Sequence, residues 1–453
     1  MTRKLKITPV LISINILVIL VIISFYMVRM YKYYKLENTP SDENTKVTLY
    51  DEILKHQSLV DQTKGLVYDE KNNIYRYIGN IDDNYIKYNG ILFRIVEIDN
   101  FNNIKIVSEN NVTLMYNSNS IFDKSFVNKW LNKTEEKYSG VFENNLYDTS
   151  SLENTASCSD IIDDLTKITC SSVDTNNKIS LLSLYDYSAS GGKQSYLNNK
   201  ETYYLSTTSS KNVGYYVAAS GDIGLNDNKA LGVRPVLTLN GSLELLEGKG
   251  TKDNPYIIEK HDVKNIKDAY IGSYIKIKND NYRIINIEND KIKVIKDGII
   301  TDENNKGVLK AFSSKSNVYA VDKKSLGYYL NNDYYNTLNK NLIVKSDFYV
   351  GSYLSTNLDY TSMYSKKINT FIALPSLSDM FINDVENIFL LNPSYENNQT
   401  IYTINNTKNI YKDLITNTHN IRPVFYIKKD NDIVSGTGTK IDPYVISEVQ
   451  NEK

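Results

Sequence analysis

One stretch of the sequence occurs twice. Residues 232–258 read GVRPVLTLNGSLELLEGKGTKDNPYII, and residues 420–446 read NIRPVFYIKKDNDIVSGTGTKIDPYVI. Arg234 and Arg422, which open the two copies, are 188 residues apart. A repeat of this length corresponds to a whole domain, because solenoid repeats have periods of about 20–50 residues. The sequence therefore predicts a tandem duplication of one domain-sized module.

Other matching segments precede each copy in the same order. The strand-like runs at 85–98 and 274–287 are each followed by a second run, at 103–110 and 291–298. Apolar, β-branched runs bounded by Asn, Asp and Gly are typical of antiparallel strands. Helical spacing follows at 126–132 and 325–338, and then SLYD at 183–186 and SLSD at 376–379, where the serine can cap a short helix. Each module is thus expected to be α+β, with a twisted antiparallel sheet and short helices.

The repeated motif contains residues whose roles we interpret as structural. Proline cannot donate a ladder hydrogen bond, so a strand is expected to begin after it or to lie at an edge. Glycine permits positive φ in a tight connection. These positions are Arg234, Pro235, Gly248, Gly250 and Pro255, repeated as Arg422, Pro423, Gly436, Gly438 and Pro443. The arginines are expected to be anchors, paired with Asp186 and Asp379. A phosphate-binding loop would need the spacing G-x-x-x-x-G-K-[ST], which is absent.

Composition sets limits on the class of partner. The 453 residues contain 52 Lys and Arg against 53 Asp and Glu, so the chain has no basic excess of the kind that nucleic acid requires. We therefore expect no nucleic-acid partner. Tyrosine is abundant, with 38 residues against one Trp. Tyrosine can stack on sugar rings, but AT-rich codons also explain its abundance, together with that of Asn, Ile and Lys.

Residues 7–28, ITPVLISINILVILVIISFYMV, contain no charged side chain. At about 1.5 Å per residue they span about 33 Å, enough to cross a hydrocarbon core of about 30 Å. A cleaved signal peptide would have a shorter apolar region that ends in small residues. We therefore predict an uncleaved transmembrane anchor. Three Lys or Arg precede it and three follow it closely, so charge bias leaves the orientation open. The short tail before the span favours a cytoplasmic N-terminus.

The predicted organisation follows from these features. It comprises a cytoplasmic tail at 1–6, the transmembrane helix at 7–28, a stalk at 29–64, module 1 at 65–259, a linker at 260–269, module 2 at 270–448 and a tail at 449–453. Leu49, Ile53, Leu54 and Val60 of the stalk have the spacing of a short amphipathic helix. The expected location is the cell membrane, with one span and both modules extracytoplasmic.

Few residues suggest chemistry. Cys158 and Cys170 are the only cysteines, and outside a membrane their simplest role is a disulfide. His56, His261 and His419 lie far apart in the sequence and form no metal motif. The loop at 302–307 lacks the ligand pattern of an EF-hand, and no G-x-S-x-G elbow is present. We expect no catalytic residue, no metal and no cofactor.

The motifs together resemble a family. The segments GLVYDEKNNIYRYIGNIDDNYIKYNGILFRIVEID, LLSLYDYSASGGKQSYLNN, GVRPVLTL and GKGTKDNPYII are similar to an uncharacterised family of membrane-anchored surface proteins from low-GC Gram-positive bacteria. The resemblance covers 65–448 and implies a module distantly related to the C-type-lectin-like fold. The calcium-binding triplets of such lectins are absent from this chain. The related oxidases need a closely placed reactive cysteine pair, and the second copy has no cysteine.

The expected function is binding and display. We expect a membrane-anchored, extracytoplasmic protein, not an enzyme, whose two lectin-like modules bind a cell-wall or surface ligand. Two rivals remain open. One is an enzyme that acts on the wall or surface through its divergent loops, for which a pocket with converging acids would be the sign. The other is a structural scaffold for a membrane partner.

Overall fold

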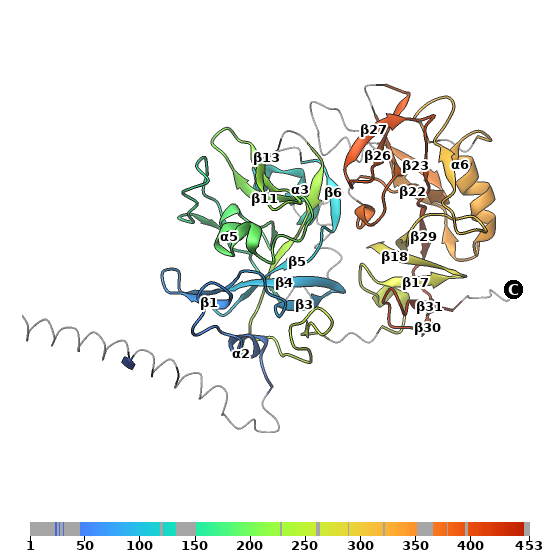
Figure 1. Ribbon diagram of the computed structural model, residues 1–453. Helices are drawn as coiled ribbons and strands as arrows, with labels where there is room; N and C mark the ends of the chain where they lie inside the picture. Colours follow the sequence, from blue (N-terminus) through green and yellow to red (C-terminus); the bar gives the residue numbers. More distant parts are fainter. Residues whose placement is uncertain are drawn as a thin grey trace, which may run out of the picture.

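The computed structural model describes residues 46–447, apart from 118–120, 133–150, 227–228, 260–262, 289, 320–321, 351–365, 378 and 395–396, and also four helical positions at 23, 24, 27 and 30. The rest of the predicted span at 7–28 lies outside the described residues. None of the described helices is long and apolar enough to cross a membrane. The described residues form mainly β-sheets with a few short helices (Figure 1).

The first half of the chain contains a nine-stranded sheet with the central order β1-β2-β4-β5-β15-β10. β3 pairs with β4 and, in parallel, with β16, while β7 pairs with β15. Its strands are β1 (Gly65–Asp69), β2 (Ile74–Ile78), β3 (Tyr85–Tyr88), β4 (Ile91–Ile98), β5 (Ile104–Ser108), β7 (Leu152–Glu153), β10 (Ile179–Ser180), β15 (Val236–Leu239) and β16 (Tyr256–Ile257).

The second half contains an eight-stranded sheet with the order β21-β29-β19-β18-β17-β31-β30, and β24 also pairs with β29. The antiparallel series β18-β19-β29 has the place of β4-β5-β15, and the parallel pair β17–β31 has the place of β3–β16. Its strands are β17 (Tyr274–Ile277), β18 (Asp280–Ile287), β19 (Lys291–Lys296), β21 (Ile343–Val344), β24 (Ile372–Ala373), β29 (Val424–Lys428), β30 (Ile433–Ser435) and β31 (Tyr444–Ile446).

Each half also has a five-stranded sheet, and the two orders correspond strand by strand. In the first half β13-β12-β11-β14-β6 includes one parallel pair, β11–β14. In the second half β27-β26-β25-β28-β20 includes the parallel pair β25–β28. The strands are β6 (Thr113–Met115), β11 (Tyr203–Thr208), β12 (Gly214–Val217), β13 (Ile223–Leu225), β14 (Leu231–Val233), β20 (Leu309–Ala311), β25 (Ile388–Pro393), β26 (Thr400–Ile404), β27 (Ile410–Leu414) and β28 (Thr418–Asn420).

Short helices and hairpins complete both halves. Serine hydroxyls cap three of the helices, and Ser183 with Asp186 forms a reciprocal capping box. The helices are α2 (Leu49–Leu54), α3 (Phe126–Leu131), α5 (Leu184–Ala189), α6 (Leu326–Tyr329) with its extensions η5 (Leu330–Tyr334) and η6 (Tyr335–Thr337), and the short turns η1 (Phe122–Lys124), η3 (Gly192–Gln194), η4 (Ile266–Asp268) and η7 (Ile382–Asp384). The hairpins are β8 (Ser157–Cys158) with β9 (Val173–Asp174), and β22 (Ser346–Tyr349) with β23 (Lys367–Thr370).

The runs at 85–98 and 274–287 are hairpins, not the single strands that we expected. In the first half Asn89 and Gly90 both have positive φ, 46° and 74°, and they turn β3 into β4. In the second half Lys278 has a φ of 53° between β17 and β18. Asn-Gly between apolar strands is the strongest short-range hairpin signal, and it was present in the sequence.

Part of the predicted stalk packs on the first half. Thr48 bridges to Glu244, and α2 buries Leu49, Ile53 and Leu54, whereas Val60 lies beyond the helix and is exposed. The predicted linker behaves similarly, because Asn265 bridges to Asp432 and η4 follows it. Both segments therefore cover the same edge of their respective halves.

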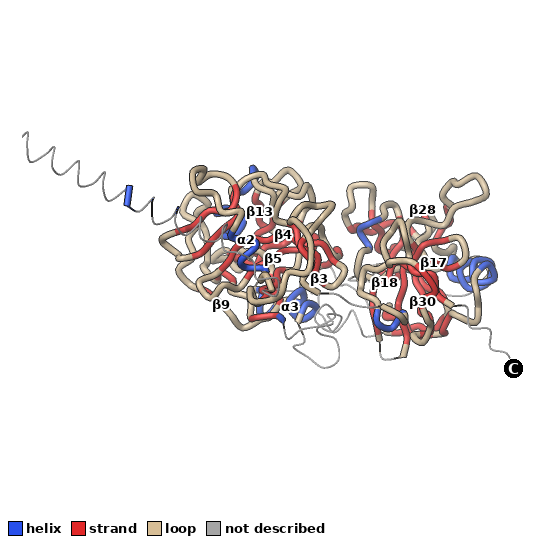
Figure 2. Tube along the Cα trace, turned by 90° about the horizontal axis from the view of Figure 1, so that it is seen from below, coloured by secondary structure: helices blue, strands red, loops and turns tan. Residues whose placement is uncertain are grey.

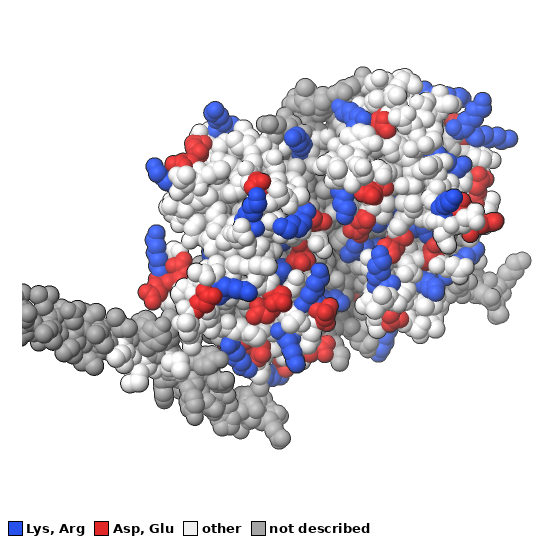
Figure 3. Space-filling model, viewed as in Figure 1, with Lys and Arg blue, Asp and Glu red and all other residues white. Residues whose placement is uncertain are grey.

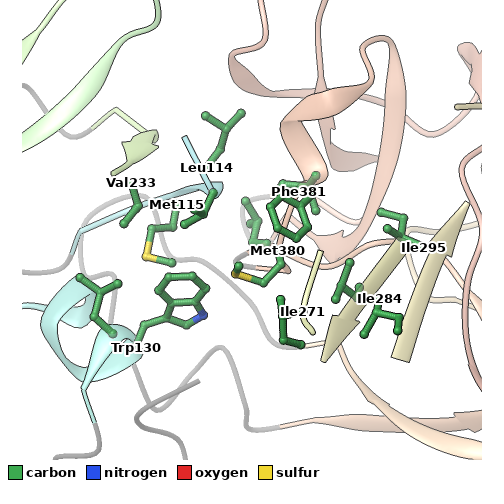
Figure 4. Close-up of a cluster of buried hydrophobic side chains, with 14 of the residues drawn as sticks. Leu114, Met115, Trp130, Val233, Ile271, Ile284, Ile295, Met380 and Phe381 are labelled. Carbon is green, nitrogen blue, oxygen red and sulfur yellow. The ribbon is translucent and has the colours of Figure 1, made fainter. Parts of the chain in front are cut away.

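The two halves meet where the second half covers the edge strand β6. The backbone N–H of Phe381 donates to the carbonyl of Val112 at 2.7 Å, and the Thr113 hydroxyl donates to the carbonyl of Asp379 at 2.6 Å. Figure 4 shows Met380 beside Met115 and Trp130 of the first half, and all three side chains are at most 2% exposed. The edge strand is thus covered by a short apolar segment, which protects its unpaired groups.

This contact predicts the effect of a charge at Met380. In Met380→Asp an isolated carboxylate would be buried at a cost of several kcal/mol, so we expect the halves to separate while each sheet keeps its fold. Small-angle X-ray scattering should show an increased radius of gyration with unchanged circular dichroism. Ile441→Asp makes the same type of change at a position that is 95% exposed and should change neither signal. An unchanged radius in Met380→Asp would refute the contact.

Candidate functional site

The repeated arginines are buried and bind backbone carbonyl groups. Arg234 donates from Nε to Ser108 O at 2.9 Å and from Nη1 to Leu197 O at 2.8 Å. Arg422 donates from Nε to Lys296 O and from Nη1 to Phe381 O, both at 2.9 Å. Burial lowers the pKa of Arg422 to about 10, so its guanidinium remains charged at neutral pH. The expected pairing of these arginines with Asp186 and Asp379 is wrong.

The two aspartates instead bind lysines on the central strands. Lys105 Nζ lies 3.4 Å from Asp186 Oδ1, and Lys293 Nζ lies 2.7 Å from Asp379 Oδ1. Each lysine stands between two apolar residues of its strand and reaches the aspartate that ends SLYD or SLSD. The signal in the sequence was a lysine inside IKI and IKV, because a lysine is almost never buried without a partner.

The first half extends this pair into a four-charge network through its additional hairpin β1–β2. Arg76 on β2 contacts both Glu97 and Asp186, and Glu97 accepts from Lys105 at 2.5 Å. Burial opposes the charge on Lys105, but Asp186 and Glu97 outweigh it and raise the pKa of Lys105. Burial likewise opposes ionisation of Asp186, but Lys105 and Arg76 lower its pKa. Both groups are therefore held charged.

The prolines and glycines of the repeated motif have the structural roles that the pattern indicates. β15 and β29 begin directly after Pro235 and Pro423. The four glycines have φ between 73° and 105°. The carbonyls of Gly250 and Gly438 accept from Tyr85 N and Tyr274 N, at the starts of β3 and β17. Pro255 and Pro443 precede β16 and β31, and a Cβ at Gly248 or Gly436 would lie about 2 Å from their carbonyl oxygens.

Cys158 and Cys170 are joined by a disulfide, with their Cα atoms 5.5 Å apart. The bridge closes the loop that follows β8, and Ile162 fixes that loop to β11 through its N–H to the carbonyl of Thr208. Asp160 accepts hydrogen bonds from Thr169, Ser171 and Ser172, which hold the loop internally. The disulfide thus stabilises one wall of a pocket.

This pocket, which we call the hairpin pocket, has a volume of about 100 Å³. Eleven of its fourteen lining residues carry a hydroxyl, amide or carboxyl group, and polar and apolar atoms contribute about equally to its surface. The lining residues are Ile121, Phe122, Asp123, Thr155, Ser157, Cys158, Ser159, Asp160, Asp174, Asn177, Ser180, Ser206, Thr207 and Thr208. They come from η1, the hairpin β8–β9 with its flanking loops, β10 and β11. Small-molecule pockets usually have volumes of about 300–1,000 Å³, so this pocket is a candidate site for one small polar group of a ligand.

Two carboxyl groups converge in the hairpin pocket. Asp123 and Asp174 both line it, and Asp123 accepts from the Asn177 amide at 2.8 Å. Burial and the neighbouring Asp174 raise the pKa of Asp123, and Asn177 only partly offsets them. Ser157 and Ser206 supply a pair of hydroxyls 3.1 Å apart. The pocket therefore offers both hydrogen-bond donors and acceptors to a polar ligand.

The histidines form no common site. His56 lies 3.8 Å from Asp83, and His419 Nε2 lies 2.7 Å from Asp413 Oδ2, while His261 is outside the described residues. Among the residues that the structure describes, no three His, Cys, Asp or Glu side chains are grouped to hold a metal ion. The loop at 302–307 is exposed, and Asp302 accepts from the backbone of Asn304 and Lys306 within its own turn.

The hairpin pocket was missed in the sequence analysis. Its residues are spread over 121–208, and no spacing rule joins Asp123 to Asp174. The only local signal was the pair of cysteines, Cys158 and Cys170. Comparisons of the chain with protein-family models, curated proteins and solved structures found no match.

The Lys293–Asp379 pair allows a double-mutant test. Lys293→Met should lower the free energy of unfolding by about 3–5 kcal/mol, because it leaves a nearly buried carboxylate unpaired. Lys293→Met with Asp379→Asn should recover most of this loss, since the polar partner is then neutral. Urea unfolding of the three variants measures the coupling. Lys306→Met, at an exposed lysine, is the control and should be neutral. Equal losses in the single and double variants would contradict the pairing.

The carboxyl pair predicts an unusual pH dependence. Because folding raises the pKa of Asp123, the folded state binds its proton more tightly than the unfolded state. This contribution to stability is complete below the unfolded pKa of about 4 and is lost as the pH rises through the folded pKa. Asp123→Asn should not show this loss of stability. The measurement is the unfolding free energy of wild type and of Asp123→Asn at pH 4 and at pH 7.

The stability contribution of Asp413 should change with pH in the opposite direction, and the same experiment can measure it. Burial opposes its ionisation, but hydrogen bonds from His419, Leu414 N and Asn417 lower its pKa. Its contribution is therefore present above the unfolded pKa and is lost as the pH falls through the folded value. For each variant, the unfolding free energy is subtracted from that of wild type and followed with pH. If this difference rises with pH for Asp123→Asn, as it should for Asp413→Asn, the carboxyl pair is refuted.

Proposed function

We propose that the chain is a membrane-anchored, extracytoplasmic surface protein that displays two copies of one module and binds a polar ligand in the hairpin pocket. The observation that carries the proposal is the lining of this pocket by hydroxyl, amide and carboxyl groups. Such a lining suits a polyhydroxylated ligand such as a wall polysaccharide, because every ligand hydroxyl needs both a donor and an acceptor.

The other parts of the proposal have separate support. The matching strand orders of the large and small sheets support a duplicated module, together with the repeated arginine and lysine contacts. The uncharged sequence of residues 7–28 supports the anchor. The disulfide supports an extracytoplasmic location, since such bonds persist in oxidising compartments. A C-type-lectin-like relationship is part of the same proposal and rests on the sequence motifs.

A second candidate is an enzyme that acts on the same class of ligand. The presence of Asp123 and Asp174 in one pocket favours it, because burial and the neighbouring Asp174 raise the pKa of Asp123, and a carboxyl group with a raised pKa can act as a general acid.

The test is binding of the full-length protein to wall fragments and to an array of glycans. Asn177→Ala removes an amide that lines the hairpin pocket, and we expect a selective ligand to bind about tenfold more weakly, the effect of about 1.4 kcal/mol. Asn176→Ala changes the exposed neighbour, which is not part of the lining, and should bind as wild type does.

Two results would overturn the proposal. One is a folded protein that binds no fragment, and the other is a ligand whose affinity is the same in Asn177→Ala and wild type. Shortening of the bound fragments by wild type but not by Asp123→Asn would replace the binding protein with the enzyme.

A further inference from the structure

Exposed apolar side chains surround α2, where the described part of the first half begins. Val47 lies before the helix, Val60 follows it, and Phe101 and Leu246 lie on adjoining loops. Phe101 is 78% exposed and Val60 is 85% exposed. Isolated exposed apolar residues need no explanation, but a group around one element indicates a contact surface.

Three of these residues adjoin one another through the backbone. Leu245 donates from its N–H to the carbonyl of Val47 at 2.9 Å, so Leu246 lies beside the start of α2. Gly241 lies in a narrow space between the turn that contains Phe101 and helix α2. A Cβ on this glycine would lie 1.8 Å from the carbonyl oxygen of Asn102 and 3.3 Å from Tyr50 Cβ. We call the group of Val47, Phe101 and Leu246, which these contacts join, the base surface.

The second half has exposed apolar residues at the same end of the molecule. Val434 on β30 has the place in the repeated motif that Leu246 has in the first half. It is 68% exposed, and Ile441 and Val445 nearby are also exposed. In Figure 1, α2 and β30 lie at the lower end of the two halves and β27 lies at the upper end. Figure 2 shows the two halves from below.

Charge does not select the partner of the base surface. Lys46 is paired with Glu244 at 2.6 Å, and Lys55 is paired with Glu52 at 2.7 Å. Over the face seen in Figure 3, Lys and Arg are interspersed with Asp and Glu. A partner would therefore be recognised mainly through apolar contact.

The position of the base surface in the chain identifies its partner. Residues 29–45 separate the predicted span from Lys46, and even fully extended these 17 residues cover at most about 60 Å. A tether of this length gives an effective concentration on the order of millimolar, so a weak contact is well populated. From this placement we propose that the base surface rests on the lipid bilayer, with Phe101 and its neighbours in the headgroup region.

The inference rests on the anchor in the proposed function and adds an orientation to it. Aromatic and aliphatic side chains on a protein surface enter the boundary between headgroups and acyl chains. Tyr50 on α2 can place its ring at the same level with its hydroxyl in water. The small sheets of both halves then point away from the membrane, and the small sheet of the first half supplies part of the hairpin pocket through β11.

The experiment places the full-length protein in nanodiscs of phosphatidylcholine, with and without bromine on the acyl chains near the headgroup. Tryptophan is introduced as Phe101→Trp or Val434→Trp, and Leu414→Trp on β27 is the matched exposed control. The single native Trp130 is buried and supplies a constant background. Brominated lipid should remove most of the added emission of Phe101→Trp and Val434→Trp, and none of that of Leu414→Trp.

The outcomes separate the inference from the anchor. Protein that does not remain with the discs would refute the anchor itself. Protein that remains with the discs but whose Trp at 101 is not quenched would overturn the inference and leave the anchor standing. Shielding of that Trp from acrylamide without bromine quenching would assign the base surface to a protein partner, and so would also overturn it. Quenching at 101 but not at 434 would support the contact for the first half and overturn it for the second.

Discussion

The structure depends on one buried guanidinium in each half. The chain leaves the small sheet at β14 or β28 and enters the large sheet at β15 or β29, and Arg234 or Arg422 lies at this crossing. Its Nε binds the carbonyl at the end of a central strand, and its Nη1 binds a loop carbonyl from the preceding layer. A planar, permanently charged group can hold both carbonyls at once, whereas the single ammonium of lysine could not do so with the same geometry.

In the second half the same arginine also supports the contact between the halves. The loop carbonyl that it binds belongs to Phe381, whose N–H reaches Val112 of the first half. Phe381 has a φ of 59°, which is strained for a bulky residue. The guanidinium of Arg283 lies 3.4 Å from the centre of its ring and fixes it from the other side. Without Arg422 or Arg283, Phe381 would relax from this strained backbone conformation, and the segment that covers β6 would lose its position.

The fold was predictable from the sequence where the signal was local. Pro235, Pro423 and the four glycines of the motif act through their own backbone, so sequence was sufficient to interpret them. The capping box at Ser183 was also local. The partners of Arg234 and Asp186 were not predictable, because opposite charge suggested an ion pair whereas the folded chain brings carbonyls to one and Lys105 to the other. The sequence shows which buried charges need a partner, but only the folded topology shows which group is that partner.

The hairpin pocket illustrates the same limit for function. The repeated residues that the sequence emphasised all stabilise the two halves, whereas the pocket lies beside the cysteine-containing hairpin β8–β9, whose counterpart β22–β23 in the second half has no cysteine. The contacts on which folding depends recur in both halves, whereas loops can change without cost to the core. Asp123 and Asp174 are brought together by η1 and β9, elements too short to be read from periodicity. A repeat in a sequence therefore identifies the scaffold, and the site is to be sought where the copies differ.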